Sequence, residues 1–321
     1  MKRMRKSVGA FLAVLMVTAM TNVPQAAAEP VGVTLGTSTQ GGGFSLYGNA
    51  LAEAINAADP GLKVEPRSTR GTGENLPLLE KGELDIALVQ GTSAYEALAG
   101  IGQPKSELKI LTAMYSSPGM FAVRGDVEAT TIEDLKGRTV VFGTEASGLV
   151  VMANYVLDGL GLDMRRDFDA VFVKRASESP PKVIGGEAVA LWGAGVGWPG
   201  FVKVSEGPAG ARFIGLTPEQ VAKVRAKHSF LKPMQLPAGS YAGQAEAVQT
   251  VGSWNFVLTR TDLPEDVAYR LIAAIDKAGP ALTAKLDQAA ETTPANTAEG
   301  APDKAMIHPG VVRYLTEKGL L

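Results

Sequence analysis

The sequence predicts an α/β protein made of two similar lobes that are joined by crossing hinge segments. At 33–44 an apolar run ends in a Gly-Thr pair, passes through a polar, glycine-rich turn and enters a helix pattern that lasts to about Ala58. The same order of features recurs at 140–157. An ordered repeat of this kind indicates two α/β units built alike. Two such units facing each other would leave a cleft between their loops.

A second pair of related segments supports the repeat. Residues 79–89 and 183–192 each show the end of a helix, a Gly-Glu pair and an apolar strand pattern. An apolar strand pattern at 251–259 is expected to return to the first lobe, so the chain crosses between the lobes at least twice and the connection acts as a hinge. The expected divisions are a signal peptide at 1–28, the first part of lobe 1 at 29–122, lobe 2 at 123–240, and a return to lobe 1 with C-terminal helices at 241–321.

The remaining elements follow from hydrophobic periodicity and from the positions of glycine and proline. Further strands are expected at 62–66, 86–89, 109–115, 120–124, 170–173 and 212–215, with a break at 116–119. Further helices are expected at 74–81, from 264 to about 277, and after Pro280. Two more are expected to begin at a capping residue, one at Thr92 or Ser93 and the last at His308. Residues 292–302 form a soluble stretch that is rich in Thr, Ala and Pro.

The first residues have the pattern of an export signal. Four basic residues lie within the first six, an apolar segment follows from Val8 to Met20, and Ala26-Ala27-Ala28 precedes Glu29. This order is typical of a cleaved secretory signal peptide, and the apolar segment is short against the ~20 residues of a membrane span. A membrane anchor is the alternative. The sequence therefore predicts export to the periplasm.

Composition excludes several function classes. Removing the signal peptide takes away four basic residues and no acids, which changes the formal net charge from −2 to −6. That charge argues against binding to nucleic acid or to an anionic membrane surface. The chain has no cysteine and only two histidines, so thiolate chemistry is excluded and a histidine-rich metal site or a Ser-His-Asp triad is not expected. No metal, cofactor or catalytic residue is predicted.

The turn at 37–44 is predicted to bind a small ligand. Glycine lets the backbone approach closely, and hydroxyl groups can donate to an acid. The helix that follows points unpaired N–H groups at the turn, where an anion is stabilised. A plain flexible turn is the alternative, and the sequence lacks the Gly-Lys-Ser/Thr of a phosphate-binding loop. The candidate ligand-binding residues here are Thr37, Ser38, Thr39, Gly42, Gly43 and Phe44.

Three further candidates lie in the first lobe, each with a second interpretation. Arg70 could hold a carboxylate through two parallel hydrogen bonds, although arginines in loops are usually solvated. Asn75 could contact the ligand or support the start of its helix. Gln90 follows a buried strand at its carboxyl end, the edge at which open α/β sheets bind ligands.

The second lobe offers a matching set of candidates. Ser147 and Gly148 correspond to the first turn, and Ser147 could serve as a helix cap or as a ligand donor. Trp192 and Trp198 stand among glycines at the end of a strand, where an indole could cover the apolar part of a ligand or fill the core. Tyr115, at the end of its strand in the first lobe, is a candidate of the same kind.

Taken in order, these segments resemble the TAXI family, the extracytoplasmic solute-binding subunits of TRAP-type transporters. The resemblance covers nearly all of the chain after the signal peptide. The matching residues are Gly36–Phe44, Gly71–Leu76, Gly82–Asp85 with Gln90, Thr131–Gly137, Ser147-Gly148, Asp262–Val267, His308–Gly310, Arg313-Tyr314 and Glu317–Gly319. Two positions differ from the family pattern, because Phe44 replaces an aromatic residue that bears a hydroxyl and Val189 replaces an aspartate.

The resemblance implies a two-lobed periplasmic binding protein fold of type II. It also implies a monomeric receptor that binds a small carboxylate, such as glutamate or a related dicarboxylate, and delivers it to TRAP membrane subunits. One alternative is a binding protein of an ABC importer for a small anion or amino acid. A secreted enzyme is a second alternative, which the residue inventory disfavours because no paired carboxylates or usable histidines are identified.

Overall fold

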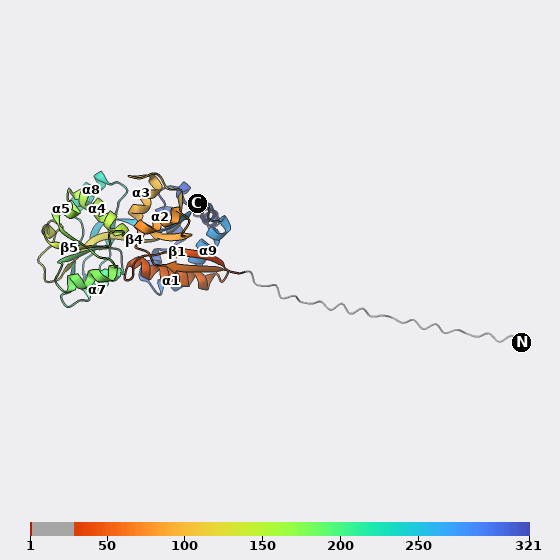
Figure 1. Cartoon of the computed structure of the whole chain (residues 1–321), viewed down its shortest axis with the longest axis horizontal. Coiled ribbons are helices and arrows are strands. Elements are labelled where there is room, and N and C mark those ends of the chain that lie inside the picture. Colours follow the sequence, from red (N-terminus) through yellow and green to blue (C-terminus); the bar gives the residue numbers. More distant parts are fainter. Residues whose placement is uncertain (2–28) are drawn as a thin grey trace.

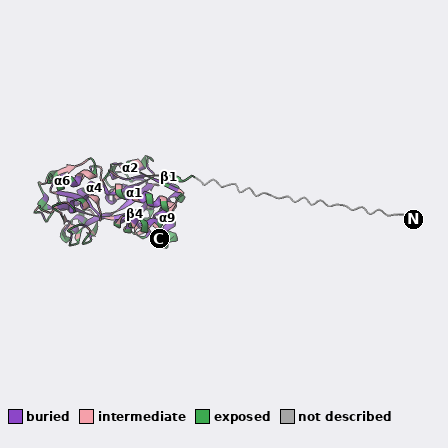
Figure 2. Ribbon diagram, turned by 90° about the horizontal axis from the view of Figure 1, so that it is seen from below, coloured by how far each residue is buried: buried purple, intermediate pink, exposed green. Residues whose placement is uncertain are grey.

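The computed structural model describes Met1 and residues 29–321, which fold into two lobes that lie side by side (Figure 1). The expected signal peptide lies, apart from Met1, outside the described residues. Strands at the centre of each lobe are buried, and exposed residues lie on the outside (Figure 2). The mixed α/β, two-lobed fold expected from the sequence is thereby confirmed.

The first lobe combines the beginning and the end of the chain. The C-terminal helices pack beside the first helix, which brings segments more than 200 residues apart into one unit (Figure 1). Its elements are β1 (Val31–Gly36), α1 (Gly43–Ala58), β2 (Leu62–Arg67), α2 (Thr72–Glu80), β3 (Ile86–Val89), α3 (Gly91–Ala99), α9 (Glu265–Thr283), η3 (Asp287–Glu291), α10 (Pro294–Gly300), η4 (Lys304–Met306) and α11 (Pro309–Glu317).

The second lobe is built from the middle of the chain. Its elements are η1 (Glu133–Leu135), β5 (Thr139–Gly143), α4 (Gly148–Leu160), α5 (Met164–Asp167), β6 (Asp169–Phe172), η2 (Ala176–Glu178), α6 (Ser179–Ile184), β7 (Ala190–Ala194), α7 (Pro199–Ser205), β8 (Ala211–Ile214), α8 (Pro218–Lys227) and β9 (Lys232–Leu236). Two long strands, β4 (Leu108–Arg124) and β10 (Val248–Arg260), belong to both lobes.

The strands pair in the order β2-β1-β3-β10-β4-β7-β5-β6, with β8 beside β4 and β9 beside β10. β1 is parallel to β2 and β3, and β5 is parallel to β6 and β7, so each lobe repeats the same parallel core. β10 runs antiparallel to both β3 and β4. Parallel strands end at one edge of the sheet, so the loops after β1, β3, β5 and β7 gather where open sheets bind ligands.

Both crossings between the lobes are made by paired strands. The first part of β4 packs in the core of lobe 1 and its last part, from Met120 to Val123, packs in the cores of lobe 2. In β10 the order is reversed, since Val251 packs in lobe 2 and Phe256 in lobe 1. The expected break at 116–119 is wrong, because β4 continues through Pro118 and Gly119 while pairing with β10.

Helix ends beside the cleft differ in detail from the sequence expectation. Gln90, and not Thr92 or Ser93, caps α3: its side-chain Oε1 accepts a hydrogen bond from the Thr92 amide at 2.8 Å. Near the C-terminus, α9 continues through Pro280 instead of giving way to a second helix, and the stretch rich in Thr, Ala and Pro contains α10. His308 does cap α11, because its Nδ1 accepts from the Gly310 amide at 3.2 Å.

Candidate functional site

A cavity between the lobes is lined by residues of both. Twelve of the fourteen candidate residues line it, from the turn after β1, the start of α4 and the aromatic positions. These twelve are Ser38, Thr39, Gly42, Gly43, Phe44, Arg70, Gln90, Tyr115, Ser147, Gly148, Trp192 and Trp198. The two Gly-rich turns therefore face one shared space, as the repeat predicts.

Four helices of nine residues or more begin at this cavity. α1 begins at Gly43, α2 at Thr72 and α4 at Gly148, and the capping residue of α3, Gln90, also lines the space. The N-terminus of a helix carries a partial positive charge and unpaired N–H groups. Arg70 is the one charged residue among the described lining residues, which include neither Asp nor Glu. The electrostatics of the cavity therefore favour an anion.

The turn after β1 also touches the second lobe. The Thr39 hydroxyl accepts a hydrogen bond from the Ala176 amide at 3.2 Å, and the Gln40 carbonyl accepts one from the Ser177 amide at 3.3 Å. A Cβ atom added to Gly43 would lie 2.9 Å from Cδ1 of Trp198, closer than real Cβ contacts allow. Glycine is required here because the two lobes approach each other closely, and the structure thus holds a closed arrangement of the lobes.

Arg70 lines the cavity but is largely solvated. Its side chain is 75% exposed and its Nε donates to Oε2 of Glu74 at 3.1 Å. The Arg70 backbone amide, which also donates to that carboxylate, together with the guanidinium lowers the pKa of Glu74. The guanidinium is therefore partly neutralised by its own neighbour.

Thr37 and Asn75 do not line the cavity. The Thr37 hydroxyl donates to the Arg67 carbonyl at 3.1 Å. The Asn75 side chain is fully buried, and its Nδ2 donates to the carbonyls of Thr37 and Leu88, both at 2.8 Å. These contacts tie the ends of β1 and β3 to α2, so both residues brace the turn from behind.

The start of α4 forms the opposite wall. Ser147 caps this helix, since its Oγ accepts from the Leu149 amide at 3.2 Å, and the hydroxyl proton is left for another acceptor. Gly148 packs against the Gln90 side chain, leaving no space for a Cβ atom. Gln90 is itself fixed, because its Nε2 donates to Oγ of Ser253 at 2.9 Å. The start of α4 in lobe 2 thus packs directly on the cap of α3 in lobe 1.

Aromatic side chains supply the apolar part of the lining. Trp192 is 1% exposed, and its indole N–H donates to the Leu149 carbonyl at 2.8 Å, so it is a core residue that shows one face to the cavity. Trp198 packs edge-on against Phe201. Tyr115 is buried beside Tyr47, and this burial raises the pKa of its phenol, which stays protonated as a hydrogen-bond donor.

Other polar lining residues were not anticipated from the sequence. Ser117 lies in β4 and Asn255 in β10, at the level where both strands cross between the lobes, and Thr144 and Ser179 come from lobe 2. No turn or glycine motif marks Asn255, and Ser117 lies in the stretch at 116–119 where the sequence predicts a break in the strand. Ser117 pairs with Ser253 of the neighbouring strand, so this part of the sheet is built from two segments far apart in the sequence.

Within residues 29–321, no three His, Asp or Glu side chains gather in a way that could hold a metal ion. Among the helices that the structure describes, none has the length and apolar character needed to cross a bilayer.

Solved structures with a similar fold place this architecture among known proteins. A protein from Bordetella bronchiseptica RB50 is 14% identical, with a TM-score of 0.55, over 90% of this chain and 98% of that one. A periplasmic transporter is 14% identical, with a TM-score of 0.53, over 83% and 88% of the two chains. A candidate L-cystine ABC transporter from Listeria monocytogenes is 14% identical, with a TM-score of 0.51, over 82% and 98%. At this identity the likeness shows a shared fold.

A comparison with protein families gives a closer relation. The model of the NMT1-like family matches residues 35–319, which include both Gly-rich turns, both crossing strands and the C-terminal helices. The match spans all of the elements that line the cavity. On this evidence, the chain belongs to the NMT1-like family.

Proposed function

We propose that this protein is an extracytoplasmic solute-binding receptor that encloses a small anion, such as a carboxylate, between its two lobes. One observation carries the proposal: four helix N-termini and a set of hydroxyl groups from both lobes converge on a cavity whose described lining contains no carboxylate. The family match and the fold shared with a periplasmic transporter support it.

The magnitudes are adequate for such a receptor. A helix N-terminus stabilises an anion by about 0.3–1 kcal/mol, and by up to about 2 kcal/mol when partly buried. A hydrogen bond to a charged group contributes about 1.5–3 kcal/mol. A few of these together exceed the roughly 8 kcal/mol of micromolar affinity, which leaves a margin for ordering costs.

The lining supports binding without covalent chemistry. Its polar groups are hydroxyls, amides, backbone N–H groups and the Arg70 guanidinium. Burial raises the pKa of Tyr115, so its phenol stays protonated at neutral pH. Groups of this kind orient a ligand and donate hydrogen bonds to it. We therefore assign no catalytic residue, and the binding residues remain the twelve that line the cavity.

The membrane partner has two candidates. The motif resemblance favours TRAP subunits, whereas the fold shared with the candidate L-cystine ABC transporter favours an ATP-driven importer, and the comparisons support the second more directly. Uptake of the bound solute by cells that carry the receptor distinguishes the two. ATP depletion at a maintained ion gradient would stop an ABC importer, while an ionophore would stop a TRAP transporter. In either case the receptor works in the periplasm, to which the expected signal peptide would direct it.

Native mass spectrometry tests the receptor function directly. Protein purified without refolding should carry a small acid that is released on mild denaturation and rebinds with 1:1 stoichiometry. A stoichiometric molecule that carries no carboxylate or other anionic group would contradict the anion assignment. Steady turnover of the released acid by the protein would contradict the receptor.

A further inference from the structure

Asn255 lies in β10, where that strand crosses between the lobes, and it is 1% exposed while lining the cavity. Its Nδ2 donates to Oγ of Ser117 at 2.6 Å and to the Tyr115 carbonyl at 3.2 Å. A backbone carbonyl can only accept a hydrogen bond, so the contact with Tyr115 fixes which side-chain atom is nitrogen and which is oxygen.

The oxygen of the same side chain has no partner. Oδ1 of Asn255 is buried and receives no hydrogen bond from any described residue. Buried polar groups in native proteins are nearly always paired, and one left without a partner marks a function or an unseen ligand. Because Asn255 lines the cavity, a ligand bound there can bring a donor to this oxygen.

Other polar groups at the cavity differ from this oxygen in what they can bind. The Ser179 hydroxyl is also buried without a partner, but it belongs to lobe 2 and can donate as well as accept. The helix N-termini offer donors and attract the anionic end of a solute. Oδ1 of Asn255 is a pure acceptor, so it requires a different part of the solute, one that carries an N–H or O–H group.

We propose that Asn255 determines the specificity of the cavity by accepting a hydrogen bond at Oδ1 from an N–H or O–H group of the solute. The inference builds on the proposed receptor function and narrows its ligand class. The solute is then a small acid that also carries an amine, amide or hydroxyl group, and acids without such a donor are rejected because they leave Oδ1 buried and unpaired.

The test uses three sets of matched probes, each an amine, a hydroxyl and an unsubstituted acid. They are glutamate, 2-hydroxyglutarate and glutarate; alanine, lactate and propionate; and taurine, isethionate and ethanesulfonate. Binding to the full mature chain is measured by calorimetry and by the shift in Tm. In the set that binds, the amine or the hydroxyl member should bind on the order of ten- to a hundredfold tighter than the unsubstituted acid.

The variant Asn255→Leu keeps the branched shape of the side chain and removes Oδ1 together with the Nδ2 donor. It should bring the affinities of the three probes within about threefold of one another, mainly by weakening the amine or hydroxyl member. Asn154→Leu, the same change at an exposed position of α4, should leave the preference intact. The comparison of probes on the unaltered protein stands even if Asn255→Leu fails to fold.

The outcomes separate this proposal from the receptor function. Equal affinities within a set that binds, or a preference that survives in Asn255→Leu, would overturn the role of Asn255 and leave the receptor in place. Absence of binding by all nine acids would overturn the small-anion receptor, and the role of Asn255 with it.

Discussion

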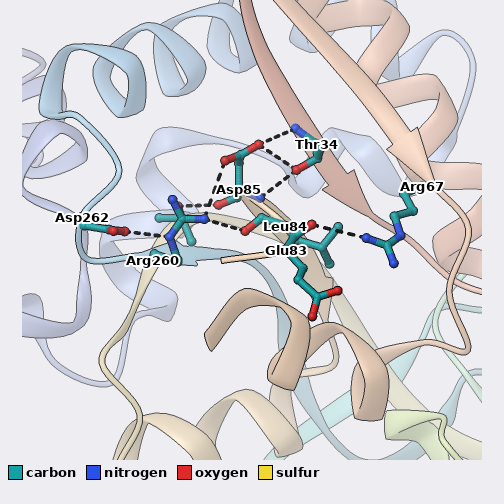
Figure 3. A network of polar contacts seen from close by, with 8 residues as sticks. Thr34, Arg67, Glu83, Leu84, Asp85, Arg260 and Asp262 are labelled. Atoms are coloured by element: carbon teal, nitrogen blue, oxygen red, sulfur yellow. Dashed lines mark hydrogen bonds and ion pairs between the residues drawn. The ribbon is translucent and has the colours of Figure 1, made fainter. Parts of the chain in front are cut away.

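The backbone amide and the hydroxyl of Thr34 both donate to one carboxylate oxygen of Asp85, at 2.8 and 2.7 Å (Figure 3). The contact joins β1 to the residue just before β3. Arg260 lies on the other side of Asp85, with its Nη1 3.7 Å from the second carboxylate oxygen, and it also binds Asp262 (Figure 3). One acid thus ties the first strand, the third strand and the returning strand β10 together at the edge of the sheet where β3 begins.

Removal of the Asp85 carboxylate should lower the stability of the protein without changing solute affinity. Asp85→Ala leaves the part-buried Thr34 amide without its partner, which should cost about 1–3 kcal/mol of unfolding free energy. Thr34→Val removes one hydroxyl and should cost about 1 kcal/mol. Urea denaturation measures both. A large loss of solute affinity in either variant would contradict the structural role, because neither residue lines the cavity.

Addition of a methyl group at Gly43 should hinder closure of the lobes. The new Cβ atom in Gly43→Ala would press on Trp198 of lobe 2. An overpacked contact costs about 1–3 kcal/mol. When this strain acts on the closed form alone, the Kd for the solute should rise roughly 5- to 150-fold, and the Tm of the solute-free protein should change little. Gly32→Ala is the matched control, since no atom lies within 4 Å of the added methyl group there. Equal affinity in both variants would argue against this contact as part of closure.

The Arg70 guanidinium should contribute only modestly to anion binding. It is mostly exposed and paired with Glu74, and exposed ion pairs contribute about 0–1 kcal/mol. Arg70→Gln should therefore weaken an acidic solute by less than about tenfold, and the loss should shrink further at high salt. A loss of a hundredfold or more in calorimetry would instead make Arg70 the main counter-charge of the anion.

A hydrogen bond between the lobes should stabilise the closed form. Tyr155 of α4 donates to Oε1 of Glu96 in α3 at 2.6 Å, and nearby the rings of Tyr95 and Phe230 stack at 4.8 Å across the same boundary. Tyr155→Phe keeps the ring and removes the donor, so the Kd should rise about tenfold or more, as expected for a bond to a charged group.

The same substitution within one lobe provides the control for Tyr155. Tyr269 donates to Glu317 at 2.6 Å between α9 and α11, both in lobe 1. Tyr269→Phe should leave the Kd unchanged. Small-angle scattering of the solute-bound Tyr155→Phe protein should show a larger radius of gyration than that of the solute-bound unaltered protein. An identical radius would mean that the hydrogen bond between Tyr155 and Glu96 does not stabilise the closed form.

His308 should make the protein less stable in acid. It is 1% exposed, and burial lowers the pKa of its imidazole. Of the charges nearby, Glu265 raises this pKa and Lys109 lowers it. In the unfolded chain the His308 imidazole takes up a proton near pH 6.5, whereas in the folded protein it does so only at a lower pH. The free energy of unfolding therefore keeps its full value above pH 6.5 and falls below that pH, by at most about 1.4 kcal/mol per pH unit.

The variant His308→Asn isolates this effect, because an amide oxygen can still cap α11. Urea unfolding at pH 7.5 and pH 5.5 should show a smaller acid loss for the variant than for the unaltered protein. The same loss in both would mean that other groups account for the acid sensitivity.

The repeat was predictable from the sequence because each copy is local. In lobe 1 the Asp85 amide donates to the Thr34 carbonyl at 3.3 Å, and in lobe 2 the Val189 amide donates to the Thr139 carbonyl at 2.9 Å. The backbone bond is thus preserved although Val189 has no carboxylate. The Thr139 hydroxyl donates to Asp169 instead, so the second lobe fixes its strands with a different acid.

Features that depend on pairing between distant strands could not be predicted from the sequence. Pro118 and Gly119 ordinarily end a strand, yet β4 continues because Gly252 of β10 lets the two backbones approach closely at this point. Asn255 lies in the same strand pair, at the register shift between Trp254 and Phe256, and nothing in its neighbourhood along the chain marks it. The candidate residues on the glycine-rich turns could be predicted because glycines and hydroxyl residues follow one another directly in the sequence there.

The chain enters lobe 2 on β4 and leaves it on β10, and these strands are hydrogen-bonded neighbours where Ser117 faces Ser253. The ends of the intervening polypeptide are therefore about one strand spacing, roughly 5 Å, apart. A segment with adjoining ends can be exchanged as a cassette between relatives without re-routing the rest of the chain. Evolution could in this way graft a new solute preference from one half of a receptor onto another.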